Sequence, residues 1–136
     1  MIMVDLFELA QIPLTFLLAD VYALLQICKK VASGQVMAVQ YLVNALEFHV
    51  NKLRNFTNVL ANKGVVEDLA RILGELSSTL ERYVDLLRDL YIRGRDREVR
   101  RGTFELIILL FKEREILREV EDRLFKFFKH DLVSVP

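Results

Sequence analysis

Apolar residues recur every three or four positions along nearly the whole chain. A spacing of three and four places side chains on one side of an α-helix, so the pattern predicts amphipathic helices. Residues 1–33 carry the series Met3, Phe7, Ala10, Leu14, Leu17, Val21, Leu24, Cys28 and Val31. Residues 35–63 carry Val36, Val39, Val43, Leu46, Val50, Leu53, Thr57 and Leu60. Residues 65–93 carry Val66, Leu69, Leu73, Leu76, Leu80, Tyr83, Leu87 and Leu90.

Glycines divide this series of apolar positions at regular intervals. Gly64 and Gly94 directly follow a cationic residue, and Gly34 comes after Lys29, Lys30 and Ser33, a pattern typical of the end of a helix. They define four segments of roughly 30 residues, each about 40–45 Å long if helical. Near-equal segments joined by short turns predict an all-α fold, an up-down-up-down four-helix bundle of long antiparallel helices that forms one domain over residues 1–136.

Three features interrupt the pattern. Pro13 lies within the first series and lacks a backbone N–H, so we expect a kink or a new helix start there. The fourth series places Glu113 at a core position. Before it, residues 104–111 are apolar at every position except Glu105, which indicates that this half of the helix has neighbours on several sides. The fourth series runs Leu106, Leu110, Glu113, Leu117, Val120, Leu124 and Phe127.

Composition adds a reason to expect assembly. Apolar residues make up 53% of the chain, and large exposed apolar patches are uncommon on monomers, so we expect an oligomer. The 19 basic and 19 acidic residues cancel, which gives no global field for a nucleic acid or a membrane. Residues 1–63 carry only 4 acids and 5 bases, which leaves 15 of the 19 acids and 14 of the 19 bases for the rest. The first half is therefore charge-poor.

Several classes of protein find no support in the sequence. A single cysteine, Cys28, excludes an intrachain disulfide and fits a reducing compartment. Asp5 and Glu8 precede the first cation, unlike the start of a signal peptide, and Asp20 interrupts the most apolar stretch, so we expect no membrane span. We expect a location in the cytoplasm or within a virion, and we expect neither a metal, a cofactor nor a small-molecule ligand.

Amide side chains form a stripe along the second predicted helix. Their spacing of three and four places them on one helix face, although Asn is a poor helix former. Amides both donate and accept hydrogen bonds, so the stripe predicts a close polar contact with another copy, a partner helix or a nucleic acid; an ordinary solvated face is the alternative. The candidate interface residues are Gln40, Asn44, Asn51, Asn55, Asn58 and Asn62, with Glu47 among them.

A stretch rich in arginine separates the third and fourth predicted helices. Residues 93–102 hold five arginines and two acids, a local net charge of +3. Guanidinium groups fit phosphate oxygens, so a connection of this type can contact a nucleic-acid backbone. The alternative is that these cations stabilise the end of the third helix. The candidate nucleic-acid-binding residues are Arg93, Arg95, Arg97, Arg100 and Arg101.

Two residues near the end of the chain suggest an enzymatic alternative. Arg123 and His130 form an R-x6-H arrangement that resembles the R-x4-6-H motif of the HEPN family, helical proteins that include metal-independent ribonucleases. The resemblance implies that His130 would transfer a proton at the 2′-hydroxyl or leaving group, with Arg123 on the phosphate. Leu124 follows the arginine where that family usually has a polar residue, and a helix-capping role for His130 is the simpler interpretation.

His49 lies between Phe48 and Val50, and we interpret it as a histidine at the edge of the core, with no partner at metal-binding spacing. The leading hypothesis is a non-enzymatic assembly subunit that oligomerises or docks through the apolar faces of the first two helices, within a nucleoprotein complex or filament if the arginines contact a nucleic acid. The alternatives are a HEPN-like ribonuclease and a dimeric regulatory protein that binds no nucleic acid.

Overall fold

The protein is a bundle of four helices, as the sequence predicts. The computed structural model describes residues 2–61 and 64–134, and the side chains of residues 10–61 and 64–127. The helices are α1 (Ile2–Ala32), α2 (Val39–Leu60), α3 (Glu67–Ile92) and α4 (Asp96–Ser134), with a 3-10 turn, η1 (Val36–Ala38), before α2. The described residues contain no strand.

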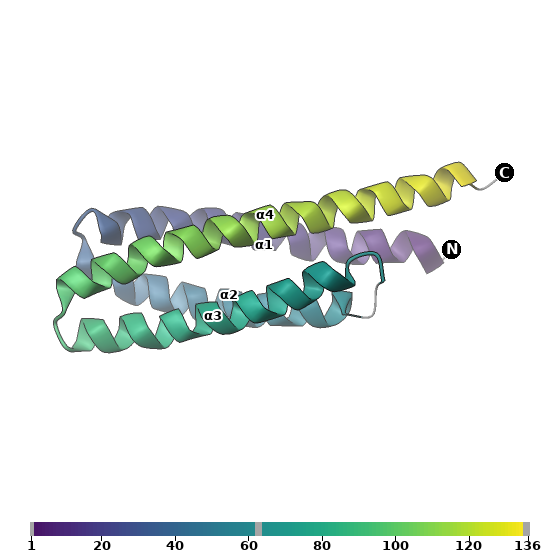
Figure 1. The fold of residues 1–136 in the computed structure, drawn as a ribbon. Helices are drawn as coiled ribbons and strands as arrows, with labels where there is room; N and C mark the ends of the chain where they lie inside the picture. The colour runs from purple at the N-terminus through teal and green to yellow at the C-terminus, as the bar shows by residue number, and fades with distance from the viewer. Residues whose placement is uncertain (1, 62–63, 135–136) are drawn as a thin grey trace.

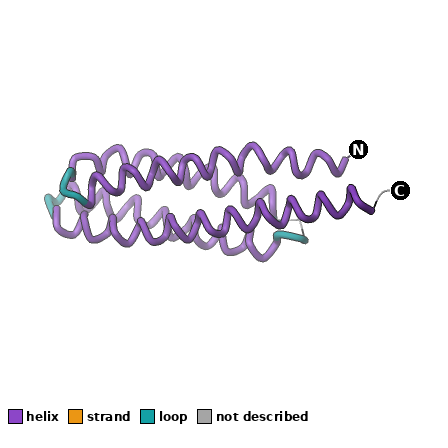
Figure 2. Tube along the Cα trace, turned by 90° about the horizontal axis from the view of Figure 1, so that it is seen from above, coloured by secondary structure: helices purple, strands orange, loops and turns teal. Residues whose placement is uncertain are grey.

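Each helix lies beside its neighbours in sequence, and α1 also packs against α4, so the four form a closed up-down-up-down bundle (Figure 1). Both termini lie at the same end of the molecule (Figure 2). The prediction of near-equal helices is wrong: α1 and α4 have 31 and 39 residues, whereas α2 and α3 have 22 and 26. The outer ends of α1 and α4 extend beyond the α2–α3 turn (Figure 1).

Two of the three glycines end helices as predicted. Gly34 and Gly94 have φ values of 117° and 69°, a left-handed conformation that side chains with a Cβ disfavour. In each case the following N–H reaches the carbonyl five residues earlier: Gln35 to Lys30 at 3.0 Å, and Arg95 to Leu90 at 3.0 Å. This is the glycine-dependent helix stop known as a Schellman motif.

The core consists of the inward-facing residues of all four helices. Leucines at the predicted three-four positions, such as Leu14, Leu46, Leu80 and Leu110, are at most 1% exposed. Full burial of a side chain of this size contributes about 1.5–3 kcal/mol, so this core supplies most of the driving force for folding. The predicted fresh helix start at Pro13 is not observed, because α1 continues through it as one helix.

One described segment, Ala10–Ala32 in α1, is long and apolar enough to cross a membrane by its length and composition alone. The core helix of a water-soluble bundle satisfies the same criterion, and Leu14, Val21 and Cys28 on this segment are buried against the other helices. The absence of a membrane span therefore stays a prediction.

Two glycine substitutions are expected to change stability in opposite directions. Gly94→Ala forces a Cβ into a left-handed conformation, so we expect the free energy of unfolding to fall by about 1–2 kcal/mol. Gly74 lies inside α3 with no neighbouring atom within 4 Å of an added Cβ. Gly74→Ala should therefore raise the free energy by about 1 kcal/mol through helix propensity. Urea unfolding followed by circular dichroism measures both, and equal signs would contradict the assignment of the turn.

Candidate functional site

The most distinctive surface of the molecule lies along α1 and α2. We define the α1–α2 face as Ile12, Phe16, Ala19, Ala23, Tyr41, Phe48, Lys52, Asn55 and Val59, all of which are exposed. Phe16 is 63% and Phe48 70% exposed, which is unusual for phenylalanine outside a binding surface. The face is therefore apolar where a solvated helix surface would carry charges.

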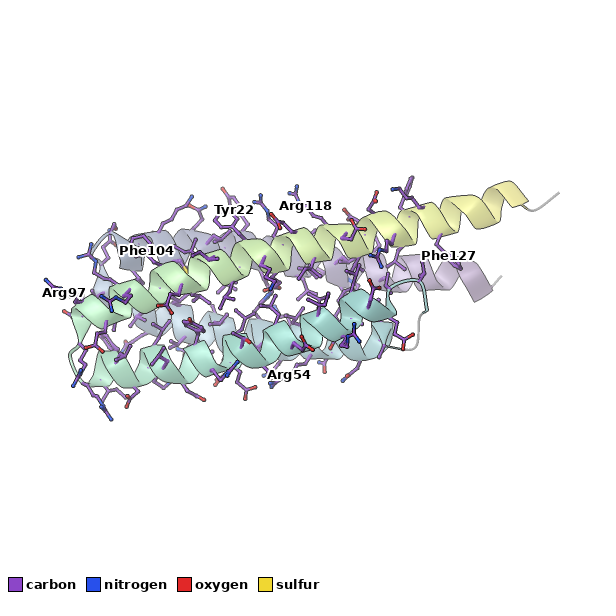
Figure 3. The ribbon with its side chains drawn as sticks, viewed as in Figure 1. Tyr22, Arg54, Arg97, Phe104, Arg118 and Phe127 are labelled. Atoms are coloured by element: carbon purple, nitrogen blue, oxygen red, sulfur yellow. The ribbon has the colours of Figure 1, made fainter. Side chains whose placement is uncertain are left out.

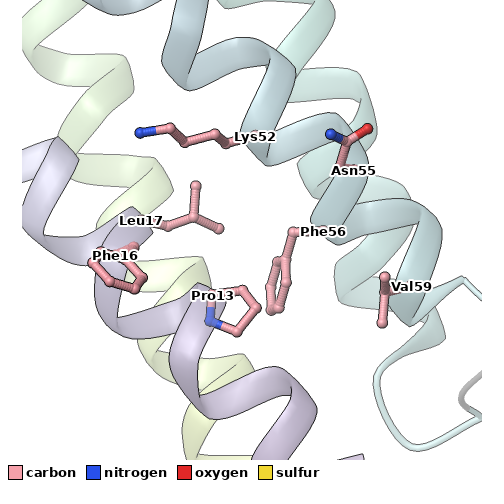
Figure 4. Close-up of a pocket in the computed structure, with 7 residues that line it drawn as sticks. All are labelled: Pro13, Phe16, Leu17, Lys52, Asn55, Phe56 and Val59. Carbon is pink, nitrogen blue, oxygen red and sulfur yellow. The ribbon is translucent and has the colours of Figure 1, made fainter.

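A groove runs along this face between the two helices. Its larger part has a volume of about 480 Å³ and is lined by Pro13, Phe16 and Leu17 from α1 and by Lys52, Asn55, Phe56 and Val59 from α2. Figure 4 shows that Phe56 points from α2 towards Pro13 on α1. A second part, of about 250 Å³, continues beyond Lys52 between Ala23 and Phe48. The groove is open, and its walls are mainly hydrocarbon.

A chain of polar contacts leads from the groove into the core. On the wall of the groove, Lys52 Nζ lies 2.9 Å from Asp20 Oδ2. The same oxygen lies 3.3 Å from His49 Nδ1, and His49 Nε2 lies 2.5 Å from Glu113 Oε2 on α4. His49 and Glu113 are 1% and 0% exposed, so this chain joins the surface of the α1–α2 face to a charged pair in the centre of the bundle.

The surroundings of His49 favour its protonated form. Burial lowers the pKa of His49, but the hydrogen bonds and charges of Glu113 and Asp20 outweigh this effect and raise the pKa above its usual 6.5. As an imidazolium, His49 donates Nδ1–H to Asp20 and Nε2–H to Glu113. With Lys52, two cations then balance two carboxylates, an arrangement that lowers the cost of burying charge.

The sequence singles out both buried groups but does not reveal that they meet. Glu113 appears as the polar exception of the fourth series, and His49 as a residue at the edge of the core. The structure corrects the second interpretation, because His49 is fully buried between α1 and α4. The two residues lie 64 positions apart, and their contact depends on the alignment of α2 with α4.

The predicted amide stripe borders the α1–α2 face. Gln40, Asn44, Asn51, Asn55 and Asn58 are all exposed, and none has a side-chain hydrogen bond among the contacts of the described residues. Asn62 lies outside the described residues. Asn55 lines the groove, whereas Gln40 and Asn44 lie on the α3 side of α2 beside Arg88 and Ile92. The stripe therefore offers unused donors and acceptors on the outer surface of α2 and reaches the groove at Asn55.

The arginine-rich stretch is not a loop, in contrast to the prediction. Only residues 93–95 connect α3 and α4, because α4 begins at Asp96. Arg93 pairs with Asp89 at 3.3 Å, and Arg95 with Glu98 at 2.9 Å. Arg100 Nε donates to the carbonyl of Ala32 at 3.0 Å and so caps the end of α1. Arg97 and Arg101 are exposed, with no ion pair to any described residue.

The HEPN-like pair is only partly described. Arg123 Nη1 lies 2.7 Å from Asp68, and its Nε lies 3.1 Å from Glu119. These contacts, chiefly the hydrogen bond to Asp68, raise the pKa of Arg123 and fasten α4 to the start of α3. The side chain of His130 lies outside the described residues. The ribonuclease alternative therefore stays a prediction.

The described residues show no cluster of three His, Cys, Asp or Glu side chains that could hold a metal ion. Burial raises the pKa of the Cys28 thiol to about 12, so this residue is a packing group rather than a nucleophile. No family model matches the chain, and neither a curated protein nor a solved structure matches it. Function therefore has to be inferred from the chain's own surfaces.

The buried imidazolium gives the stability of the bundle a pH dependence. A group whose pKa is higher in the folded than in the unfolded state stabilises the fold fully below the unfolded pKa, near 6.5, and loses that contribution as the pH rises through the folded pKa. We expect the free energy of unfolding to fall as the pH rises above about 6.5. Urea titrations of the wild type and of His49→Leu/Glu113→Leu measure it, and an identical slope in both proteins would exclude His49 as the source.

For the buried pair His49 and Glu113, we expect a single substitution to destabilise the fold more than a double substitution. Glu113→Ala leaves a charged His49 in the core beside Asp20 alone, which should cost about 3–5 kcal/mol at pH 6. Replacing both residues removes both buried charges at similar volume. The double variant His49→Leu/Glu113→Leu should match or exceed the wild type in stability. Thermal unfolding at pH 6 compares the three proteins, and additive losses would contradict direct coupling between the two residues.

Proposed function

We propose that the protein is a non-enzymatic assembly subunit and that the α1–α2 face binds a second copy of the same chain. The observation that carries this proposal is the apolar groove, whose two parts share Lys52 and carry the exposed Phe16 and Phe48. Two such faces, brought together by a two-fold axis, would bury the rings that a monomer leaves in water.

The charge of the face favours a second copy over a charged partner. Asp20 and Lys52 are the only ionised groups on the groove walls, and they neutralise each other at 2.9 Å. A charged partner would find no counterpart here, whereas an identical neutral face meets no repulsion. The bordering amides fit the same contact, because Asn can both donate to and accept from another Asn.

The area of the face is sufficient for a dimer. A whole aromatic side chain has a surface of about 200 Å². On this scale the exposed apolar area is roughly 500 Å², summed over Phe16, Tyr41, Phe48, Ile12 and Val59. A typical stable interface buries about 800 Å² on each partner, of which somewhat more than half is apolar. The exposed amide stripe would supply the polar remainder.

Other solvent-exposed surfaces of the bundle carry ordinary charged residues. The exposed side of α3 carries Arg71, Glu75, Arg82, Asp85 and Asp89. Charged side chains favour the helix and keep a surface soluble, so their scarcity on the α1–α2 face, where Asp20 and Lys52 pair with each other, is a local property and not a general feature of this sequence.

The proposal predicts that acidic residues on the face produce monomers. In Phe16→Glu/Phe48→Glu, two carboxylates per copy would have to be desolvated and would repel those of the partner. We expect the wild type to elute as a dimer and the variant as a folded monomer, with at least a tenfold loss of dimer affinity. Multi-angle light scattering across a concentration series measures both masses.

A matched control is available on the other side of the bundle. Leu86→Glu makes the same apolar-to-acidic change at an exposed position of α3 that lines neither the groove nor the amide stripe. This control should retain the mass of the wild type. A wild type that is monomeric at all concentrations, or a control that dissociates as readily as the Phe16/Phe48 variant, would overturn the proposal.

A further inference from the structure

A second unusual surface lies on the other side of α1, where α1 meets α4. We define the basic aromatic face as Tyr22, Lys29, Arg97, Arg101, Phe104, Ile108, Phe111, Arg114 and Arg118. On α4, the spacing of Arg97, Arg101, Phe104, Ile108 and Phe111 places these five side chains in one line. Figure 3 shows Arg97 at the end of the bundle where α3 connects to α4, and Tyr22 and Arg118 along the side formed by α1 and α4.

Contacts between the two helices fix this arrangement. Arg100 of α4 reaches the carbonyl of Ala32 at the end of α1, and Arg118 lines a groove with Leu18 of α1. Lys29 precedes Ala32 by about one helical turn, and Phe104 follows Arg100 by the same amount, so both lie on the next turn of the α1–α4 pair. Tyr22 lies one turn beyond Leu18 towards the same end.

The large apolar side chains on this face are exposed in the part of the chain that the structure describes. Tyr22 is 66%, Phe104 56% and Ile108 69% exposed. The prediction that the apolar half of the fourth helix has neighbours on several sides is therefore not met within the chain, because the bundle covers only the inward side of α4. The Arg114 guanidinium lies 5.3 Å from the centre of the Phe111 ring, so cations and rings alternate on this surface.

The face carries more cations than acids at the start of α4, whereas Arg118 at its other end shares a groove with Glu121 and Asp122. The face as a whole carries five cations, Lys29, Arg97, Arg101, Arg114 and Arg118, and the only acid in the same line of α4 up to Arg118 is Glu115. Of the nearby acids, Glu98 pairs with Arg95 at 2.9 Å, and Glu105 accepts a hydrogen bond from the neutral Tyr83 hydroxyl at 2.5 Å and so keeps its charge beside Arg97 and Arg101. No described residue forms an ion pair with any of the five cations.

These cations do not stabilise their own helix. Arg97 and Arg101 lie in the first two turns of α4, where the helix dipole disfavours positive charge. Unlike Arg93, Arg95 and Arg100, they form no ion pair or hydrogen bond with any described side chain. Two unpaired arginines followed on the same line by exposed rings therefore indicate a ligand that is anionic and flat.

We propose that the basic aromatic face binds single-stranded nucleic acid, with the arginines on the phosphates and Tyr22 and Phe104 stacked against bases. Single strands suit this surface because their bases are free to stack on exposed rings, whereas duplex bases are not. A second copy fits poorly, since a two-fold contact would bring five cations against five. A membrane fits less well, because a helix that lies on a membrane keeps its cations on a face separate from its apolar residues, whereas here arginines and rings share one line.

Fluorescence anisotropy of labelled oligo(dT) and oligo(rU), each about 20 nucleotides long, tests the proposal. We expect binding at low salt that weakens as salt rises, by about 0.7 units of log K per unit of log salt for each phosphate contacted. Arg97→Glu/Arg101→Glu should lower the affinity at least tenfold. The control Arg71→Glu/Arg82→Glu makes the same charge change on α3 and should change it less than twofold.

A third variant separates stacking from other apolar contacts. Phe104→Leu keeps an apolar side chain and removes the ring, so the affinity for oligonucleotides should fall about fivefold or more. Co-sedimentation with phosphatidylserine vesicles provides the second arm. The proposal would be overturned if the wild type bound no oligonucleotide, or if the two arginine variants lost affinity equally. It would also be overturned if the protein bound vesicles while Phe104→Leu bound oligonucleotides as tightly as the wild type.

The oligonucleotide-binding test of the basic aromatic face does not depend on the α1–α2 face. Phe16→Glu/Phe48→Glu leaves every residue of the basic aromatic face in place, and Arg97→Glu/Arg101→Glu leaves the groove intact. Light scattering of the arginine variant should therefore give the wild-type mass. A protein that is monomeric yet binds oligonucleotides would refute the assembly proposal alone.

Discussion

Each helix in this bundle can bury only the residues that point towards the other three helices. The remaining residues are exposed to solvent, where another molecule can bind them. Leu14, Leu46, Leu80 and Leu110 lie on inward faces and are buried. The chain also carries large apolar side chains on outward faces, which this arrangement of the four helices does not cover. Because such side chains cost stability and solubility in a free monomer, their positions mark where other molecules are expected to bind.

The two exposed surfaces differ in the feature that decides what they can bind. The α1–α2 face is neutral, since its one ion pair, Asp20 with Lys52, cancels within the chain. The basic aromatic face has unpaired arginines beside its rings. The α1–α2 face lies on the α2 side of α1 and the basic aromatic face on its α4 side, so under the two proposals a second copy and a nucleic-acid strand would bind at different places on one copy. Such a combination is the geometry required of a subunit that coats a strand, which unites the two halves of the leading hypothesis from the sequence.

The sequence predicts the fold because local rules and long-range packing agree in it. The three-four apolar series gives the helices, and glycines after Lys30 and Arg93 give two of the turns. Helix lengths are predicted less well, because Gly64 lies four residues beyond the end of α2 at Leu60. The start of α4 is also missed, since charged residues without apolar periodicity resemble a connection, whereas Asp96 begins the helix directly.

The candidate sites are harder to predict because each is assembled from helices distant in sequence. Periodicity identifies Glu113 as an exception, but only the alignment of α2 with α4 places it 2.5 Å from His49. The arginines illustrate the same limit. The sequence gives all five the same weight, whereas the structure assigns three to internal contacts and leaves Arg97 and Arg101 in line with Phe104. Composition can therefore indicate that a chain carries excess cations and rings, but only the contacts within the fold show which of them remain for a ligand.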